Sequence, residues 1–224
     1  LAFFRFIVPF QMFLSEVIGL GDSAAVLLIS LLLMLATYIL YMGMKKFMDA
    51  LFIREEARKD DSLRQFSQAV SKTLELDCIL REMSEVIRES VGVQRMFFFI
   101  RDQKGVYRIE HTGSPLEEKA FTLDASHPLV GSVRAAEGCL MMADFQRTTA
   151  YKAMWEEEKQ RLRTWDVECM SAFRAEDELI GFAMFSGKER RRPFSGEDIS
   201  FIQSVSSVCA MAVKNARLYE QAYE

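Results

Sequence analysis

Histidine, proline and paired cysteine are scarce in this chain of 224 residues, and their scarcity excludes several kinds of site. There are two histidines, four prolines and four cysteines, and the cysteines are far apart: Cys78, Cys139, Cys169 and Cys209. Without a Cys-x-x-Cys pair or a histidine cluster, neither a zinc site nor a disulfide framework is predicted, and reduced core thiols are expected. A glycine-rich phosphate loop, a Ser/His/Asp set and a paired-acid motif are also missing, so we expect no catalytic residues and no metal.

Basic charge is not in excess either. The chain has 28 Lys and Arg against 32 Asp and Glu, which gives a net charge of −4 and a pI near 5.5. This balance argues against a nucleic-acid partner.

A long apolar run near the N-terminus is the most informative feature that is present. Residues 23–44 carry no charge, and as a helix they would measure about 33 Å, enough to cross a bilayer core of about 30 Å. Lys45 and Lys46 follow at once, whereas residues 19–23 contain no Lys or Arg. The positive-inside rule therefore predicts that everything after the run lies in the cytoplasm.

Residues 1–20 form a second apolar stretch, interrupted by Arg5, Pro9, Gln11 and Glu16. We expect residues 1–46 to be a transmembrane hairpin whose second span is 23–44, with an interfacial helix as the alternative for the first stretch. These features predict a multi-pass protein of the inner (cytoplasmic) membrane.

The segment after the membrane run has helical character. No proline occurs between Lys45 and Val91, and apolar residues recur at helical spacing from Leu63 onward. We expect residues 47–73 to form a juxtamembrane signalling helix, while a solvated helix face is the alternative for the mixed charges of residues 54–61. Asp77 is predicted to cap the helix that follows.

The remaining residues, 74–224, predict one α+β domain. Residues 94–100, 106–111, 138–143, 170–175 and 179–185 have the patterns of strands, with turns at 101–105 and 176–178. Residues 129–136 and 149–165 are predicted helices, and a last helix is expected over 195–223, with Ser195 as its cap. We expect helices packed on an antiparallel sheet.

The order of several motifs resembles the GAF domain family. The relevant pieces are residues 74–80 with 91–95, residues 127–133 with 137–138, residues 179–185 with 192–198, and the ending 213–219. The resemblance implies a central antiparallel sheet flanked by helices. It also implies a homodimer formed through the first and last helices of the domain, and a small-molecule pocket on the opposite face of the sheet.

The resemblance further implies regulation rather than catalysis, so the chain is not expected to be an enzyme. We expect a membrane-anchored sensory domain that relays ligand or partner binding through a helical dimer to a following output domain. That output domain would be a diguanylate cyclase or a histidine kinase, in cyclic-di-GMP or two-component signalling. The alternative is a dimerisation scaffold that binds no ligand.

Cyclic-nucleotide-binding members of the family carry a signature whose Lys, Phe and Asp could be Lys188, Phe194 and Asp198 here. The Asn of that signature is not evident and Ile199 occupies its last acidic position, so we expect a structural turn instead. The surroundings of Cys139 and Cys169 do not fit bilin attachment, and His111 and His127 are not expected to bind haem. No cofactor is therefore predicted.

Aromatic and methionine side chains are the candidates for a ligand pocket, since small-molecule sites are mostly apolar. The candidate set is Phe97, Phe99, Met141, Met142, Phe145, Trp155, Trp165 and Phe173. The alternative is that these side chains fill the core. The basic run 188–192 is expected to be a solvated turn, with contact to anionic lipid as its alternative.

Overall fold

The computed structural model describes residues 22–113 and 121–223, and it divides the chain into two compact units, Leu1–Glu55 and Glu56–Glu224. Each unit is described by itself. The first predicted membrane segment, residues 1–20, lies outside the described residues. Helix α2 (Asp22–Val70) contributes to both units.

The part of α2 in the first unit is apolar and exposed. Within the described residues, one helical segment, Ser30–Met48, is long and apolar enough to cross a membrane, judged by length and composition. Side chains along it such as Leu31, Met34 and Leu40 are about two-thirds exposed or more, so no protein core covers them. This segment overlaps the predicted span 23–44, and Lys45 and Lys46 lie inside it.

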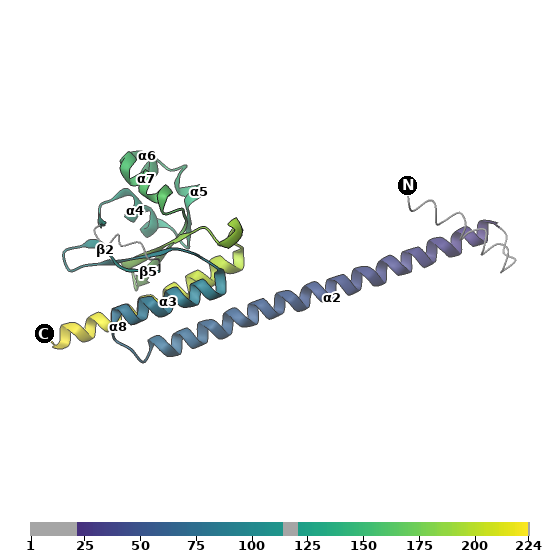
Figure 1. Cartoon of the computed structure of the whole chain (residues 1–224), viewed down its shortest axis with the longest axis horizontal. Coiled ribbons are helices and arrows are strands. Elements are labelled where there is room, and N and C mark those ends of the chain that lie inside the picture. Colours follow the sequence, from purple (N-terminus) through teal and green to yellow (C-terminus); the bar gives the residue numbers. More distant parts are fainter. Residues whose placement is uncertain (1–21, 114–120, 224) are drawn as a thin grey trace. The chain divides into compact units, whose positions relative to one another are not determined.

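The second unit is a six-stranded antiparallel sheet between two helical layers (Figure 1), as the sequence predicts for its fold class. The strand order is β3-β2-β1-β6-β5-β4. The strands are β1 (Met96–Arg101), β2 (Val106–Thr112), β3 (Thr122–Asp124), β4 (Leu140–Met141), β5 (Val167–Ala175) and β6 (Glu178–Ser186). The helices are α3 (Leu76–Val91), α4 (Pro128–Ala135), α5 (Met142–Phe145), α6 (Thr149–Ala153), α7 (Glu156–Thr164) and α8 (Gly196–Tyr223), with a 3₁₀ turn at Glu189–Arg191.

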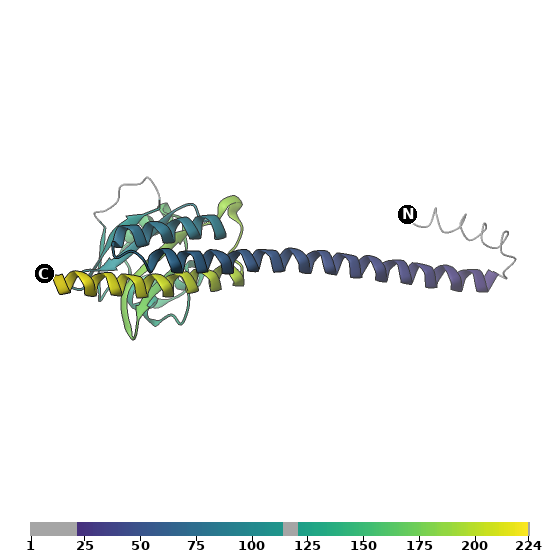
Figure 2. The ribbon, with the colours of Figure 1, turned by 90° about the horizontal axis from the view of Figure 1, so that it is seen from below.

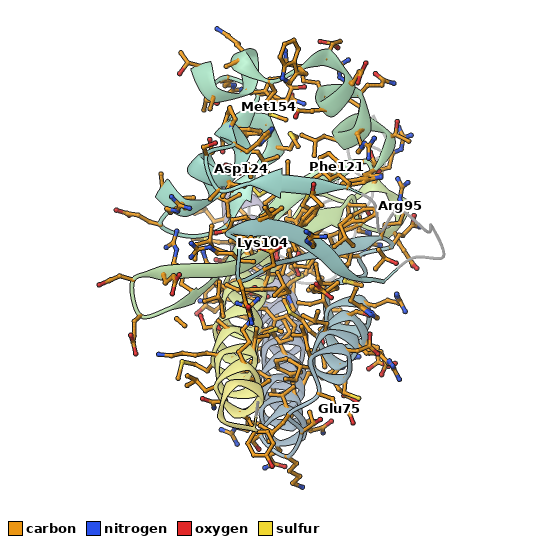
Figure 3. All side chains as sticks on the ribbon, turned by 90° about the vertical axis from the view of Figure 1, so that its left-hand side faces the viewer. Glu75, Arg95, Lys104, Phe121, Asp124 and Met154 are labelled. Carbon is orange, nitrogen blue, oxygen red and sulfur yellow. The ribbon has the colours of Figure 1, made fainter. Side chains whose placement is uncertain are left out.

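One face of the sheet, here called the helix face, is covered by long helices. Figure 2 shows α3 and α8 running along this face, and the end of α2 adds Phe66 and Val70 to the same apolar cluster. The other face, here called the aromatic face, is covered by the short helices α4 to α7. Figure 3 shows the sheet edge-on between these layers, with Met154 beyond the aromatic face.

Strand β1 shows how one sequence supplies both faces. Met96, Phe98 and Ile100 belong to the cluster under the helix face, whereas Phe97 and Phe99 belong to the cluster under the aromatic face. Successive side chains of a strand point to opposite faces, so a continuous apolar run is what a strand buried on both faces requires. The central place of β1, between β2 and β6, follows from this pattern.

The predicted elements differ from the structure at several ends. The helical region before the sheet is broken between Val70 and Leu76, and Glu75, not Asp77, precedes α3 as its cap residue. The prediction for Asp77 was therefore wrong: it lies in the first turn of α3, where its carboxylate bonds Arg81 and His111. Gly92 ends α3 with φ of 79°, a left-handed conformation that suits glycine.

Further differences lie between the strands. The predicted helix 149–165 is two helices, because Met154 and Trp155 adopt extended backbone angles between α6 and α7. The predicted strand 138–143 shortens to β4, since α5 begins at Met142. The hairpin formed by β5 and β6 and the long last helix are confirmed. At the start of α8, Ser195 and Asp198 exchange reciprocal hydrogen bonds, which confirms the predicted cap.

Candidate functional site

The aromatic face brings together most of the side chains proposed for a ligand pocket. Five of them lie in one buried cluster under α4 to α7: Phe97, Phe99, Met142, Phe145 and Trp165. Trp165 lies between α7 and β5 and is wholly buried. These residues come from three separate parts of the chain, so the fold itself assembles the candidate site.

Ring contacts fill the centre of this cluster. The rings of Phe97 and Trp165 stack with their centroids 4.2 Å apart, and those of Phe99 and Phe182 stack at 4.7 Å. Phe121 meets Trp165 edge-on at 5.4 Å. In this conformation the space beside Trp165 is occupied by aromatic side chains, so a ligand entering there would displace a ring.

Three of the proposed residues lie elsewhere. Phe173 belongs to the cluster under the helix face, and Met141 packs against it. Phe173 lies an even number of residues after Cys169 in β5, and Met141 is the partner of Cys169 in β4, so all three side chains point to the same face of the sheet. Trp155 is 78% exposed at the start of α7. Residue type alone had grouped these side chains, and the alternation of the strands separates them.

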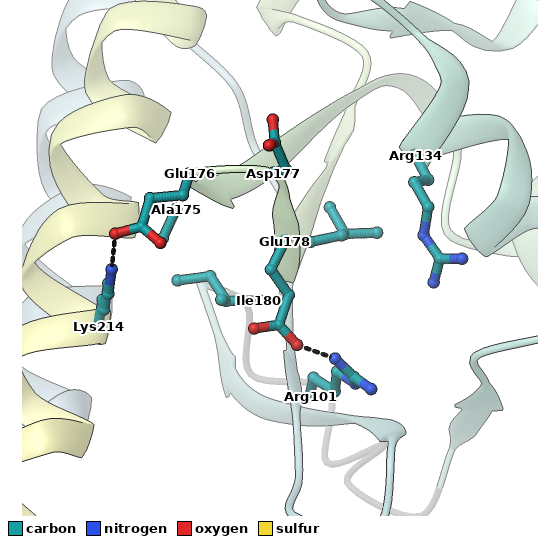
Figure 4. Close-up of a pocket in the computed structure, with 9 residues that line it drawn as sticks. Arg101, Arg134, Ala175, Glu176, Asp177, Glu178, Ile180 and Lys214 are labelled. Atoms are coloured by element: carbon teal, nitrogen blue, oxygen red, sulfur yellow. Dashed lines mark hydrogen bonds and ion pairs between the residues drawn. The ribbon is translucent and has the colours of Figure 1, made fainter.

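A larger hollow surrounds the tip of the β5–β6 hairpin. This hairpin groove has a volume of about 610 Å³ and is lined mainly by charged side chains (Figure 4). Lys214 of α8 pairs with Glu176 at 2.5 Å, and Arg101 of β1 pairs with Glu178. The charges of the groove thus largely neutralise one another. Arg134 of α4 also lines it, and the sequence had indicated only a turn here.

A smaller cavity of about 220 Å³ lies among α5, α6, α7 and β5. It is lined by Met142, Gln146, Tyr151, Leu162, Arg163, Asp166 and Val167. Met142 is the only lining residue that belongs to the proposed set. Its lining therefore mixes apolar side chains with the polar side chains of Gln146, Arg163 and Asp166.

Asp198 lies at a junction of three elements, here called the Asp198 junction. Its carboxylate accepts a hydrogen bond from the Lys59 ammonium of α2 at 2.9 Å and another from Lys188 at 2.6 Å. A third hydrogen bond, at 2.9 Å, comes from the backbone N–H of Ser195. Lys59 and Asp198 are both buried. The junction ties the end of α2 to the first turn of α8.

The charges of the junction determine the acidity of Asp198. Burial raises the pKa of this carboxyl, but the hydrogen bonds from Lys188, Lys59 and Ser195 outweigh burial and hold it at about 2. Lys188 also lies over the ring of Phe194, 6.0 Å from its centroid. The residues that resemble the cyclic-nucleotide signature therefore form the structural turn that the sequence predicts, and they anchor α8.

The two histidines have local partners. His111 lies 3.2 Å from the Asp77 carboxylate. His127 accepts a hydrogen bond from the backbone N–H of Leu129, which caps α4, and its other ring nitrogen lies 3.0 Å from the Glu158 carboxylate. In the part of the chain that the structure describes, no group of three or more His, Cys, Asp or Glu side chains could hold a metal ion.

Comparison with known proteins identifies the family. A family model described as "GAF domain" matches residues 75–213, which is more than half of the chain. No curated protein matches the chain.

Solved structures match the fold of the second unit at low sequence identity. The GAF domain of a phosphoenolpyruvate-protein phosphotransferase from Coxiella burnetii matches with a TM-score of 0.59 and 22% identity, covering 74% of this chain and 98% of that one. Residues 122 to 287 of a methyl-accepting chemotaxis protein match with a TM-score of 0.57 and 15% identity, covering 69% and 98%. A protein from Geobacter sulfurreducens with GAF and HD domains matches at 0.54 and 17%, covering 66% and 98%.

Proposed function

The chain belongs to the GAF domain family, and from this premise we propose that it is a sensory domain that relays a signal to the helix α8. The observation that carries the proposal is the Asp198 junction, in which Lys59 of α2 and the first turn of α8 share one buried carboxylate. A shift of either helix changes the contacts of the other at this point. The chemotaxis and phosphotransferase proteins with the same fold support a role in signalling.

The sheet supplies a path from the aromatic face to α8. Phe97 and Phe99 of β1 contact the aromatic cluster, while Phe98, between them, contacts the cluster under the helix face. A ligand that displaces the ring of Trp165 would move Phe97, and with it the strand that supports the helices. Such a relay requires two conformations that differ in ligand affinity.

We propose that the exposed apolar segment of α2 anchors the protein in the inner membrane as part of a multi-pass region, with the GAF domain in the cytoplasm. The support is the segment Ser30–Met48 and the basic residues Lys45 and Lys46 near its end. A signal sequence is the alternative. Protease accessibility of the GAF domain in sealed inverted vesicles would distinguish them, since only a cytoplasmic domain is exposed there.

Exposed apolar side chains on α8 support a homodimer. Met211, Leu218 and Tyr219 are each about half exposed, although α8 otherwise buries its apolar residues. We propose that a second copy covers them. Met211→Glu with Leu218→Glu should raise the dimer dissociation constant at least tenfold in analytical ultracentrifugation, whereas Lys152→Glu on α6 should not change it.

The proposed output domain is a diguanylate cyclase or a histidine kinase, connected through α8. Among the α8 side chains that the structure describes, which end at Tyr219, the last buried one is Ala216, and the helix continues to Tyr223, which suits a connecting role. The chain itself is proposed to regulate and not to catalyse.

Tryptophan fluorescence provides the test for a ligand. In the Trp155→Phe variant of the full chain in detergent, the remaining Trp165 reports on the aromatic cluster, and in Trp165→Phe the exposed Trp155 is the control. A ligand should shift the emission of the first variant only and release heat in calorimetry. If no candidate metabolite does so, the sensory proposal fails.

The second candidate is a dimerisation scaffold without a ligand. The observation in its favour is the Phe97–Trp165 stack at 4.2 Å, which fills the centre of the aromatic cluster. This candidate would be supported if no metabolite changed the fluorescence or released heat while the protein remained a dimer.

A further inference from the structure

Two cysteines that are 30 residues apart in sequence lie together in the fold. Cys139 directly precedes the edge strand β4, and Cys169 lies in β5. In the antiparallel register, Leu140 pairs with Met170 and Met141 pairs with Cys169. Residue 139 is therefore the diagonal neighbour of residue 169 on the same face of the sheet, the helix face.

The two thiols are neighbours in this register, and the ionisation of one affects that of the other. Ser171 occupies the position directly opposite Cys139. The Cys139 sulfur also lies 3.9 Å from the backbone carbonyl oxygen of Ile199 in α8. This last contact links the edge of the sheet to α8.

The environments of the thiols differ in a way that assigns separate roles. Cys139 is partly exposed, whereas Cys169 is wholly buried. The hydrogen bond from Cys169 lowers the pKa of Cys139, more than burial raises it, and Ser171 lowers it further. The same contact, together with burial, raises the pKa of Cys169. Because Cys139 is the partly exposed thiol of the pair, it is the one that an oxidant in solution reaches first.

The local backbone permits the small movement that a disulfide needs. Diagonal neighbours in a sheet are about 7–8 Å apart, whereas a disulfide requires Cα atoms within about 4.4–6.8 Å. Strand β4 consists only of Leu140–Met141 and lies at the sheet edge, so a shift of it disturbs few ladder hydrogen bonds. Gly138 fits closely under α8: a Cβ there would lie 2.1 Å from the Gln203 side-chain nitrogen.

We propose that Cys139 is an oxidation site for hydroperoxides and that Cys169 resolves it as a cross-strand disulfide. The Cys139 thiolate attacks the terminal oxygen of the hydroperoxide, the O–O bond breaks, and an alcohol or water leaves. The resulting sulfenic acid loses its hydroxyl as water when the Cys169 sulfur attacks Cys139. In sum, two thiols are oxidised by two electrons while one hydroperoxide is reduced to an alcohol and water.

The disulfide would be sensed at α8. Forming it draws the Cys139 sulfur away from the Ile199 carbonyl and shifts Gly138 beneath Gln203. Both contacts lie in the first turns of α8, next to the Asp198 junction. Oxidation at this site would therefore affect α8 directly, without a change on the aromatic face.

Peptide mapping of the full chain in detergent tests the proposal. The reduced protein is treated with hydrogen peroxide, quenched with an alkylating agent and digested without reductant. We expect the peptides of Cys139 and Cys169 to become linked, about 2 Da below the sum of the two thiol peptides. Cys78 and Cys209 in the same sample are the controls, and we expect Cys139 to react about tenfold faster than Cys78, whose pKa is raised by Glu75.

Two variants assign the order of events. In Cys169→Ser, dimedone should trap a sulfenic acid at Cys139, and in Cys139→Ser the buried Cys169 should stay reduced. If a variant does not fold, the peptide map of the oxidised wild-type protein alone decides whether the disulfide forms. Absence of the linked peptide, oxidation of Cys169 in Cys139→Ser, or equal rates at Cys78 and Cys139 would each overturn the proposal.

Discussion

The two faces of the sheet are closed in different ways. The helix face is covered by long helices and holds the buried ion pairs of the Asp198 junction, whereas the aromatic face is covered by four short helices and holds most of the ring contacts. On the helix face, buried ion pairs hold the helices in position, whereas on the aromatic face the packing of rings fills the core. The face proposed to bind a ligand and the face proposed to transmit a signal are therefore built from different chemistry.

The largest expected effect lies at the centre of the aromatic face. Trp165→Ala removes a wholly buried side chain that stacks on Phe97, so it should lower the free energy of unfolding of the GAF domain by about 4 kcal/mol. Trp155→Ala is the matched control, and since Trp155 is exposed it should change stability by less than about 0.5 kcal/mol. Urea unfolding followed by circular dichroism measures both. Similar losses in the two variants would contradict the difference between these tryptophans.

A somewhat smaller effect is expected on the helix face. Asp198→Ala removes the buried carboxylate that lies 2.9 Å from Lys59 and leaves this lysine only the half-exposed Glu197 at 3.9 Å, so it should cost about 3 kcal/mol of unfolding free energy. Glu197→Ala changes the adjacent, half-exposed carboxylate and should cost less than about 1 kcal/mol. If Lys59→Met restores much of the loss in Asp198→Ala, the buried charge is its cause.

The stability that the Asp198 junction contributes should depend on pH. The pKa of Asp198 is about 2 in the folded state, below its ordinary value of 3.8, so its contribution is present above pH 4 and is lost as the pH falls toward 2. We expect the difference in unfolding free energy between wild type and Asp198→Asn to shrink by about 2 kcal/mol over that interval. A difference that stays constant from pH 6 to pH 2 would show that the carboxylate is not held ionised.

The smallest effect is expected at the exposed ion pair of the hairpin groove. Lys214→Ala breaks the pair with Glu176, and because Glu176 is exposed it should change stability by less than about 0.5 kcal/mol. The same variant measured in 1 M salt should not differ from wild type. A loss near that of Asp198→Ala would mean that burial does not govern the strength of these pairs.

Local patterns predicted the parts of the fold that depend on neighbours in sequence. The β5–β6 hairpin and α8 follow from a turn between apolar runs and from helical periodicity, and the cap of α8 follows from Ser195 and Asp198. The break before α3 was predicted from the interrupted pattern at residues 74–77, although its cap residue is Glu75 and not Asp77. The division between α6 and α7 was missed, since no proline or glycine marks that place.

The candidate site was harder to predict because it depends on which face a strand residue occupies. Residue type suggested that Phe97 and Phe173 belong together, yet strand alternation places them on opposite faces. Lys59 and Asp198 are separated by 139 positions, and Cys139 and Cys169 show no spacing typical of a pair. Only the register of the sheet and the packing of the helices reveal these contacts.

Strand β1 leaves little freedom for substitution, because its first five residues, Met96 to Ile100, are all buried and a polar side chain at any of them would be buried without water. Short helices such as α5 and α6 carry no such restriction on their outer sides. Sequence changes can therefore accumulate in the segments over the aromatic face, while the strand beneath them and the helices behind it stay the same.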